Sequence, residues 1–421
     1  MFFVYNLLLI FLAIVLSPLV AVAFAVQPKL RAGFFKKMGF YPENDRVKGR
    51  SIWIHAVSVG EINAVEGLVK HIKTEFSAYP IVVTTVTRTG QEVARKKLAG
   101  IADVISYFPY DFSFAAKAAI KAFNPALVII AETEIWPRFV YEVNRKNIPL
   151  MLVNGRISPN SFKGYRKARL FFRNVLDKFS LILMQTESDA ERIAKIGAPK
   201  DIVQVMGNLK FDISTKLDSV TVETLKESLK VGNNRVLIAG STHSGEDEIV
   251  LEVFGKLKTD FPDLKLLLAP RHPERNEAVL RLIKASGFSN ARKSEGGRFD
   301  NADIILLDTM GELGKLYAIS HLAFIGGGFS GTGGHNPLEP AIYGVPVLSG
   351  PAVFNFKDIY KFMTASGAAK IANNAGELNT QLKEYLLNDD KYKMASEACL
   401  EIFAKNCGAT DYAIQRIKEY I

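Results

Sequence analysis

The chain has 421 residues, 48% hydrophobic and 23% charged, which is a globular composition long enough for two domains. Its only cysteines, Cys399 and Cys407, argue against a disulfide scaffold or a thiolate metal site. The formal net charge of +10 is compatible with binding to nucleic acid, with binding to anionic lipid, or with a solvated basic surface. Because the sequence holds no aromatic-basic motif of a nucleic-acid module, we expect lipid rather than nucleic acid as the partner.

The first segment, residues 1–26, carries no charged side chain and as a helix could span a bilayer core of about 30 Å. Basic residues follow it, at Lys29, Arg31, Lys36 and Lys37. A cleavable signal peptide would carry its positive charge before the apolar run, although residues 21–23 resemble a cleavage site. The charge order therefore favours an uncleaved membrane anchor with its C-terminal side in the cytoplasm.

From Ser51 onward, short apolar segments alternate with amphipathic helical patterns such as 61–75 and 91–98, the βαβ rhythm of parallel α/β domains. The first group of predicted strands comprises 51–55, 81–85, 127–130, 150–153, 181–184 and 202–205. After a polar stretch at 208–232, a second group comprises 236–239, 264–269, 304–307, 322–325 and 345–348. We therefore expect two α/β domains that face a cleft and bind ligands at the carboxyl ends of their strands.

Glu61 follows the first predicted strand in the segment His55–Glu61, where a glycine turn leads into a helix. A carboxylate at that end of the sheet can act as a general base if its pKa suits and a substrate proton is within reach. A first-turn glutamate can equally do no more than interact favourably with the helix dipole. Both interpretations are compatible with the spacing.

Three further charged residues lie near predicted strand ends or the domain junction. Glu132 and Glu134 precede Pro137; at this spacing we expect only one of them to point into the cleft, unless both only initiate a helix. Lys210 lies where the domains join and could neutralise developing negative charge, or form a hinge salt bridge with Asp212.

Segments suited to binding an oxyanion follow strands of the second domain. The segments 241–243 and 270–275 offer hydroxyls and arginines, and Arg271 could bind phosphate or carboxylate bidentately unless the segment is a surface turn. The segment 308–313 is similar but weaker. In Gly326–Glu339, glycines permit close backbone approach, Asn336 is a good N-cap and Pro337 suits the first helical position, so we expect a phosphate at this helix start.

Several other site types are excluded by motif. The glycine-rich segment is neither a dinucleotide fingerprint nor a P-loop, although it could still be a plain connecting loop. The six histidines show no paired ligand spacing and no Asp-x-Asp is present, so no metal site and no cofactor is expected. No Gly-x-Ser-x-Gly elbow supports a serine hydrolase.

Taken together, the motifs resemble the 3-deoxy-D-manno-octulosonic acid (Kdo) transferase family of lipopolysaccharide biosynthesis. The resemblance runs from the N-terminus almost to the C-terminus, and only the loop around 330–332 is less familiar. The matching segments are 55–61, 84–90, 132–137, 154–158, 207–212, 241–243, 270–275, 308–313, 333–339 and 355–358.

This resemblance implies roles for particular residues. Glu61 would be the general base that deprotonates a sugar hydroxyl of a lipid A precursor, which displaces CMP with inversion, while Glu132 and Lys210 would assist the transition state. Glu339 would accept hydrogen bonds from the ribose hydroxyls. The residues expected to hold CMP are Pro270, Arg271, Met310, Gly311, Glu312, Asn336, Pro337, Leu338 and Glu339.

The resemblance also implies a GT-B fold of two Rossmann-like domains. We expect a membrane anchor over residues 1–26, an acceptor domain over 27–210 and a CMP-Kdo donor domain over 211–421, whose last helix could pack back on the acceptor domain. The expected location is the inner membrane, with the catalytic domains on the cytoplasmic side and membrane lipids as partners. Two alternatives remain, a GT-B enzyme that uses a UDP-sugar and a non-catalytic, membrane-anchored nucleotide-binding protein.

Overall fold

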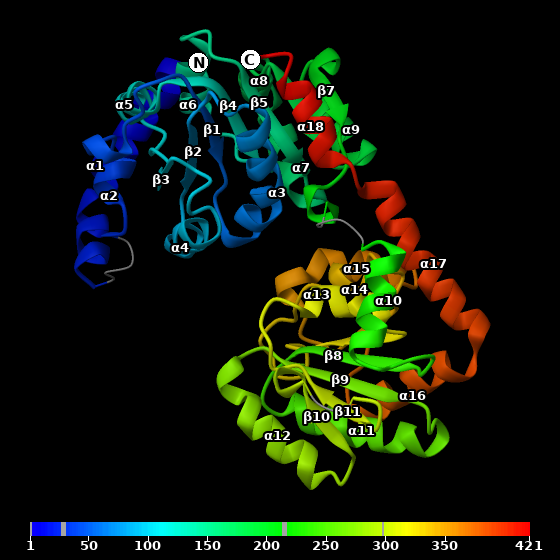
Figure 1. Ribbon diagram of the computed structural model, residues 1–421. Helices are drawn as coiled ribbons and strands as arrows, with labels where there is room; N and C mark the ends of the chain where they lie inside the picture. The colour runs from blue at the N-terminus through cyan, green and yellow to red at the C-terminus, as the bar shows by residue number, and fades with distance from the viewer. Residues whose placement is uncertain (1, 27–30, 213–216, 297–298) are drawn as a thin grey trace. The chain divides into compact units, whose positions relative to one another are not determined.

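A computed structural model describes residues 2–26, 31–212, 217–296 and 299–421. The chain divides into two compact units, each built on a seven-stranded parallel sheet (Figure 1). Unit 1 comprises Met1–Asp212 and Asn406–Ile421, and unit 2 comprises Ile213–Lys405. Two parallel α/β sheets are the architecture that the βαβ rhythm predicts.

The sheet of unit 1 has the strand order β3-β2-β1-β4-β5-β6-β7. Its strands are β1 (Ser51–His55), β2 (Ile81–Thr85), β3 (Val104–Tyr107), β4 (Pro125–Ala131), β5 (Leu150–Gly155), β6 (Leu181–Met184) and β7 (Val203–Val205). All six strands predicted here are present, and β3 was not predicted. Trp53 packs on one face of the sheet, whereas Ile52 and Ile54 pack on the other, as the two-residue period of a strand requires.

Helices cover both faces of this sheet. They are α1 (Phe2–Val26), α2 (Phe34–Lys37), α3 (Val59–Glu75), α4 (Arg88–Lys97), α5 (Ser113–Phe123), α6 (Pro137–Asn144), α7 (Pro159–Lys167), α8 (Arg169–Leu176), α9 (Glu187–Ile196) and α18 (Ala409–Ile417). Short 3₁₀ turns are η2 (Glu43–Asp45), η3 (Lys200–Ile202) and η4 (Leu209–Phe211).

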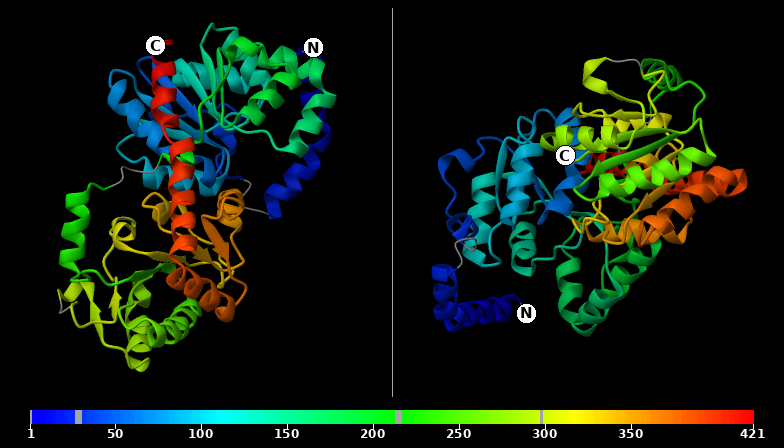
Figure 2. Two further views of the ribbon diagram at one scale, coloured as in Figure 1. Left: turned by 90° about the vertical axis from the view of Figure 1, so that its right-hand side faces the viewer. Right: turned by 90° about the horizontal axis from the view of Figure 1, so that it is seen from below.

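The C-terminal helix α18 belongs to unit 1, as the red end of the chain in Figure 2 shows. Ala413 and Ile414 enter the same hydrophobic core as Ile62 and Val65 of α3. Asp212 fixes the start of α18, because its carboxylate accepts hydrogen bonds from the backbone N–H groups of Gly408 (2.7 Å) and Thr410. The end of the chain is thereby fastened to unit 1.

Helix α1 is attached to unit 1 through its first turns. The Phe2 ring lies 4.7 Å from that of Tyr141 on α6, and the Tyr5 hydroxyl donates to Asp111 at 2.9 Å. Among the helices of the described residues, none combines the length and the apolar character needed to cross a membrane. The membrane-spanning anchor predicted over residues 1–26 is therefore not found, and Met1 itself lies outside the described residues.

The sheet of unit 2 has the strand order β10-β11-β9-β8-β12-β13-β14. Its strands are β8 (Val236–Thr242), β9 (Lys265–Pro270), β10 (Asn290–Arg292), β11 (Ile304–Leu306), β12 (Leu322–Ile325), β13 (Val347–Ser349) and β14 (Ala369–Ile371). The five predicted strands are present, and the edge strands β10 and β14 were not predicted.

The helices of unit 2 begin within the stretch that was expected to link the domains, where α10 lies. They are α10 (Ser219–Ser228), α11 (Glu246–Asp260), α12 (Asn276–Ala285), α13 (Leu313–Leu316), α14 (Leu338–Ala341), α15 (Lys357–Ala365), α16 (Ala375–Leu387) and α17 (Asp389–Asn406). The 3₁₀ turns are η5 (Pro273–Arg275), η6 (Lys293–Glu295), η7 (Tyr317–Ile319) and η8 (Phe354–Phe356).

Candidate functional site

Glu61 lies in the first turn of α3, just beyond the carboxyl end of β1, which is next to the central strand β4. Its carboxylate accepts hydrogen bonds from the Val57 backbone N–H (2.7 Å) and the Ser58 hydroxyl (2.9 Å). Ser58 in turn caps the helix by accepting from the Glu61 backbone N–H at 3.5 Å. This reciprocal arrangement is close to a capping box, so Glu61 has a structural role in starting α3 as well as a position at the sheet edge.

The environment of Glu61 changes its acidity. Burial raises the pKa of its carboxyl group to about 7, and the nearby carboxylates of Glu132 and Glu134 add to this rise. The hydrogen bonds from Val57 and Ser58 lower the pKa but do not outweigh the burial. The side chain is largely buried, with 7% of the residue exposed. A carboxylate with a pKa near 7 is suited to accept a proton at neutral pH, which a solvent-exposed glutamate is not.

Glu132 follows β4 in a turn, not a helix, with a left-handed backbone (φ 54°). Such a conformation is costly for a non-glycine residue and is typical of functional sites. The Glu132 carboxylate lies 3.6 Å from the Lys210 ammonium group. Lys210 thus pairs with Glu132 and not with Asp212, whose carboxylate holds the start of α18, so the hinge salt bridge considered from the sequence is not formed.

Both carboxylates of the Glu132–Glu134 pair raise the pKa of Glu61. Glu132 lies in a turn that ends the strand, and Glu134 follows it before α6 begins. Burial, and then Glu132, raise the pKa of Glu134 as well. Unit 1 therefore gathers three carboxylates and one lysine beyond its central strands.

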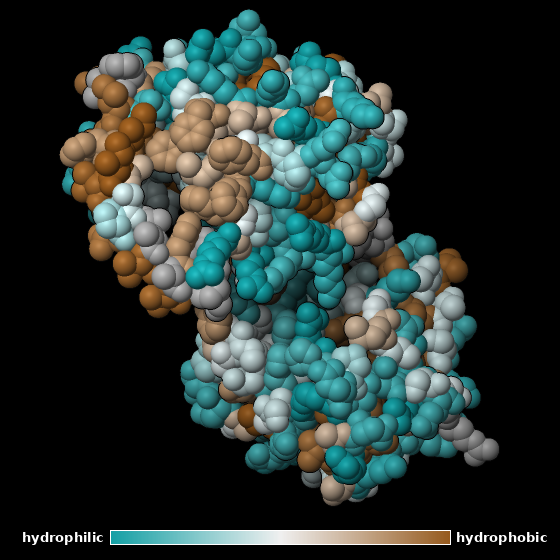
Figure 3. Space-filling model, turned by 90° about the vertical axis from the view of Figure 1, so that its left-hand side faces the viewer, coloured by the Kyte–Doolittle hydropathy of each residue, from teal (hydrophilic) through white to brown (hydrophobic). Residues whose placement is uncertain are grey.

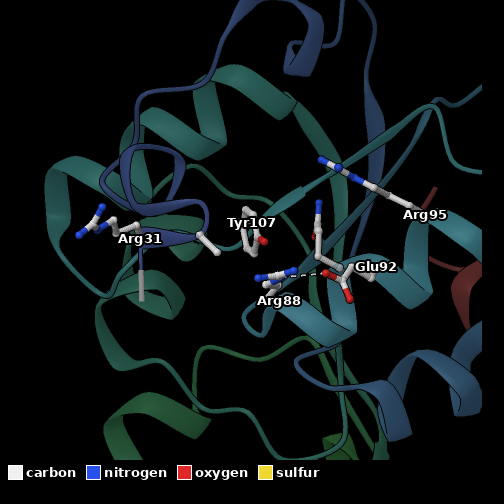
Figure 4. Close-up of a pocket in the computed structure, with 7 residues that line it drawn as sticks. Arg31, Arg88, Glu92, Arg95 and Tyr107 are labelled. Carbon is white, nitrogen blue, oxygen red and sulfur yellow. Dashed lines mark hydrogen bonds and ion pairs between the residues drawn. The ribbon is translucent and has the colours of Figure 1, made fainter. Parts of the chain in front are cut away.

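A basic pocket of about 430 Å³ is lined by residues of α4, by Tyr107 at the end of β3 and by Arg31 and Ala32. In Figure 4, Arg31, Arg88 and Arg95 are placed around the ring of Tyr107, and Arg88 is joined to Glu92 by an ion pair of 2.8 Å. Helix α4 starts beside the Glu61 turn, because the hydroxyl of its N-cap Thr87 donates to the Val57 carbonyl at 3.2 Å. This pocket, which sequence reasoning did not find, could hold an anionic group.

In unit 2, the four segments with predicted oxyanion-binding residues follow four neighbouring strands. The order β11-β9-β8-β12 brings together the ends that carry residues 308–312, 270–272, 241–243 and 326–339. The carboxyl ends of parallel strands share one edge of the sheet, so these segments lie at the same edge, where a ligand of such a sheet would bind.

The glycine-rich segment is organised by Glu246, a residue that sequence reasoning missed. The Glu246 side chain is completely buried in the first turn of α11, and its carboxylate accepts four backbone N–H groups. The donors are His243 (2.9 Å), Gly327 (2.7 Å), Phe329 (2.9 Å) and Ser330 (3.2 Å). These N–H groups are already used within the protein.

The rest of the segment is also closed on itself. The N–H groups of Gly333 and Gly334 donate to the Gly327 carbonyl at 3.1 Å, and that of His335 donates to Gly326 at 3.2 Å. These three N–H groups are therefore also used within the protein. Glycine in this segment permits close packing, because a Cβ atom on Gly328 would lie 2.5 Å from the Gly350 nitrogen.

The helix after this segment starts one residue later than predicted. Helix α14 begins at Leu338, with Pro337 as its N-cap. The Asn336 side chain nevertheless accepts a hydrogen bond from the Leu338 N–H at 3.2 Å, which is the contact expected of an N-cap residue. The Asn336 amide also donates to Glu339 at 3.4 Å. Glu339 lies over α13, where a Cβ built on Gly314 would be 4.0 Å from its carboxylate.

Pro270 ends β9, and the exposed Arg271 follows it, held by a backbone hydrogen bond to the Thr242 carbonyl at 3.0 Å. Arg275 has a different role. Its guanidinium forms an ion pair with the buried Asp247 and donates to the Thr242 carbonyl at 3.1 Å. Arg271 is thus the arginine of this turn that is exposed to solvent, whereas Arg275 stabilises the turn through its contacts with Asp247 and Thr242.

The Met310–Glu312 turn joins β11 to α13. Gly311 has a positive φ of 81°, and Met310 is 76% exposed. The Glu312 carboxylate accepts from the Thr309 hydroxyl and the Lys293 ammonium group (2.9 Å), which hold its pKa below the usual range. Glu312 is therefore anionic and already paired, so its own side chain is not a site for phosphate.

The sequence is similar to one family of known proteins. The family described as 3-deoxy-D-manno-octulosonic-acid transferase (kdotransferase) matches residues 32–213. A 3-deoxy-D-manno-octulosonic acid transferase of Haemophilus influenzae is 33% identical over all of this chain and 98% of its own length.

Two solved structures are also similar. The C-terminal CMP-Kdo binding domain of WaaA from Acinetobacter baumannii is 28% identical, covering 44% of this chain and 96% of its own, with a TM-score of 0.42. UDP-GlcNAc 2-epimerase from Neisseria meningitidis is 12% identical, covering 88% and 100%, with a TM-score of 0.53; it shares the fold. On the full-length sequence match, this chain belongs to the 3-deoxy-D-manno-octulosonic acid (Kdo) transferase family of glycosyltransferases.

Proposed function

We propose that this enzyme transfers Kdo from CMP-Kdo to a hydroxyl group of a lipid A precursor, lipid IVA, in lipopolysaccharide biosynthesis. Family membership supports the Kdo transfer, and the acceptor and the roles of individual residues are the proposed part. The observation that carries the proposal is Glu61, a buried carboxyl group at the carboxyl end of β1 whose pKa is raised to about 7.

In the proposed reaction, the acceptor hydroxyl oxygen attacks the anomeric carbon of Kdo while Glu61 takes its proton. The bond from that carbon to the phosphate oxygen breaks, and CMP leaves with the electron pair, so the configuration inverts. Lys210, held by Glu132 at 3.6 Å, supplies positive charge that would offset the negative charge of the transition state. Ser58 and the Val57 N–H orient the Glu61 carboxylate.

The donor is proposed to bind at the strand ends of unit 2. Arg271 supplies an exposed guanidinium for a phosphate or carboxylate. Asn336 and Glu339, which contact each other, offer an amide and a carboxylate that could bind cytidine and ribose hydroxyls.

The proposed function is tested by mass spectrometry of the product formed from CMP-Kdo and tetra-acylated lipid A precursor. We expect product whose mass increases by one or more Kdo residues, and inhibition by CMP but not by UDP. Formation of no Kdo-containing product, or competition by UDP in place of CMP, would contradict the proposal and favour a transferase that uses a UDP-sugar.

Transfer is expected to need no divalent metal. Among the described residues, no group of three or more His, Cys, Asp or Glu side chains is placed to hold a metal ion. We expect EDTA to leave kcat unchanged, since Lys210 and Arg271 can supply the positive charge. Loss of activity in EDTA that added Mg²⁺ restores would contradict this mechanism.

We propose that the enzyme works at the cytoplasmic surface of the inner membrane, where its lipid acceptor lies. Supporting this, α1 has exposed apolar side chains, among them Leu7 (50%), Phe11 (62%) and Ile14 (67%), and Figure 3 shows hydrophobic atoms gathered on this side of unit 1. The pocket around Arg31, Arg88 and Arg95 adds positive charge that attracts anionic lipid.

Co-sedimentation with vesicles that contain phosphatidylglycerol tests this surface. Changing Phe11 and Ile14 to Glu should reduce the bound fraction several-fold, because both apolar contacts are replaced by charges that anionic lipid repels. Leu387→Glu is the matched control, since Leu387 is 65% exposed but lies in unit 2. Equal binding by the α1 variant and the wild type would remove α1 from the lipid contact.

A further inference from the structure

Two histidines of unit 2 form a hydrogen-bonded pair beside the proposed donor site. His243 follows β8 and His335 ends the glycine-rich segment, and their Nε2 atoms lie 2.8 Å apart. The ring planes differ by 2° and the centroids are 5.1 Å apart. The rings therefore meet edge to edge in one plane, which is the geometry of an N–H···N hydrogen bond.

This geometry limits the number of protons that the pair can hold. In the neutral pair, one Nε2 carries the proton and the other accepts it. A further proton can add at the Nδ1 of the donating ring, which leaves the N–H···N bond intact and makes it charge-assisted. A fourth ring proton would put two N–H groups face to face at 2.8 Å, so the intact pair can gain one positive charge and no more.

Without a ligand, the pair is neutral at pH 7. Burial, and then Arg271, His243 and His272, lower the pKa of His335 to about 4. The pKa of His243 is also lowered, mainly by burial. The carboxylate of Glu246 raises it, whereas His272, Arg275 and Arg271 lower it further. An anion beside the pair would oppose these effects and favour the charged form.

An anion beside the pair has to be bound by positively charged side chains, because the backbone offers few N–H donors there. The N–H groups of Gly327, Phe329, Ser330, Gly333 and Gly334 donate within the protein. The positive charge at this strand edge must then come from side chains, and Arg271 is the exposed cation that acts on both histidines.

We infer that the His243–His335 pair is a proton-coupled part of the donor site. It takes up one proton when the phosphodiester of the CMP-sugar binds, and the resulting cation, together with Arg271, contacts the phosphate. Release of the nucleotide returns the pair to its neutral form. This inference rests on the proposed binding of a CMP-sugar in unit 2.

Isothermal titration calorimetry of the full-length enzyme with the methyl phosphodiester of CMP tests the inference. This probe has the diester charge of the donor and does not titrate near pH 7, so protons taken up belong to the protein. Measurements at pH 7 in buffers of different ionisation enthalpy should show uptake of about one proton, and affinity should fall up to tenfold for each unit of rising pH.

Variants locate the proton. His243→Gln and His335→Gln should bind the probe roughly tenfold more weakly at pH 7 and take up no proton, because a charge-assisted contact is lost. His272→Gln is the matched control, since His272 lies beside the pair (5.5 Å between the ring centroids of His272 and His243) but outside its hydrogen bond. This control should keep the uptake of the wild type.

The outcomes separate this inference from the proposed function. Wild-type binding of the probe with no proton uptake, or uptake that persists in both pair variants, overturns the inference and leaves the donor site standing. Failure of the wild type to bind the probe overturns both. The uptake and the pH dependence of the wild type decide the matter even if a variant does not fold.

Discussion

The Glu61→Gln variant is expected to lose at least about 100-fold in kcat, because general-base catalysis typically contributes a factor of 10² to 10⁴. A glutamine can accept the hydrogen bond from Val57 or Ser58 but cannot take a proton. The start of α3 should therefore persist while the chemistry fails. Turnover with saturating CMP-Kdo and acceptor measures the effect, and CMP affinity should match that of the wild type.

The control for this variant is Glu66→Gln on the same helix. Glu66 pairs with Lys70 and Lys97 at 2.8 and 2.7 Å on the surface, so its removal should leave kcat within about twofold, as surface ion pairs contribute little. Wild-type turnover by Glu61→Gln would remove Glu61 from the mechanism. A similar loss in both variants would point to damage of α3 instead.

Replacing Glu246 by Ala is expected to destabilise unit 2 by roughly 3 kcal/mol or more and to abolish CMP binding. Four backbone N–H groups would lose their acceptor, and each buried unsatisfied group costs about 1–3 kcal/mol. The glycine-rich segment would no longer be held beside His243. Denaturant unfolding and calorimetry with CMP measure the two effects.

Glu248→Ala is the matched control, because Glu248 is exposed in the same first turn of α11. It should change the free energy of unfolding by no more than about 0.5 kcal/mol. If Glu246→Ala bound CMP with wild-type affinity, the glycine-rich segment would not depend on this carboxylate. That result would contradict the role of Glu246 in organising the donor site.

The sheets could be predicted from the sequence because their central strands are continuous apolar runs. Leu127–Ile130 and Leu322–Ile325 are buried on both faces and bounded by clear turn signals. The strands that were missed, β3, β10 and β14, are only three or four residues long and include partly exposed positions, so they lack such a run.

The candidate site was only partly predictable. Ser58 and Glu61 have the spacing of a capping box, but burial raises the pKa of Glu61, and burial depends on the whole of unit 1. In the sequence, Glu246 is one of three acidic residues at the predicted start of a helix. Only the fold brings its carboxylate into contact with a segment some eighty residues away. The nearest signal in the sequence was the predicted oxyanion-binding segment 241–243, which ends three residues before Glu246.

The contacts of α1 with the rest of unit 1 could not be predicted from the sequence. Hydropathy over residues 1–26 does not reveal that Phe2 and Tyr5 make specific contacts with Tyr141 and Asp111 of unit 1. Those contacts depend on side chains more than a hundred positions away along the chain.

The pH dependence of kcat/KM for the acceptor, measured with saturating donor, tests the role of Glu61 most directly. Burial raises the pKa of the Glu61 carboxyl group to about 7, so the fraction able to accept a proton falls tenfold per unit below that pH. We expect kcat/KM to follow this fraction, with a midpoint near pH 7 and a plateau above it. A profile that stays flat down to about pH 5 would contradict a Glu61 base with a pKa near 7, because it is the profile of an ordinary glutamate, whose pKa is about 4.3.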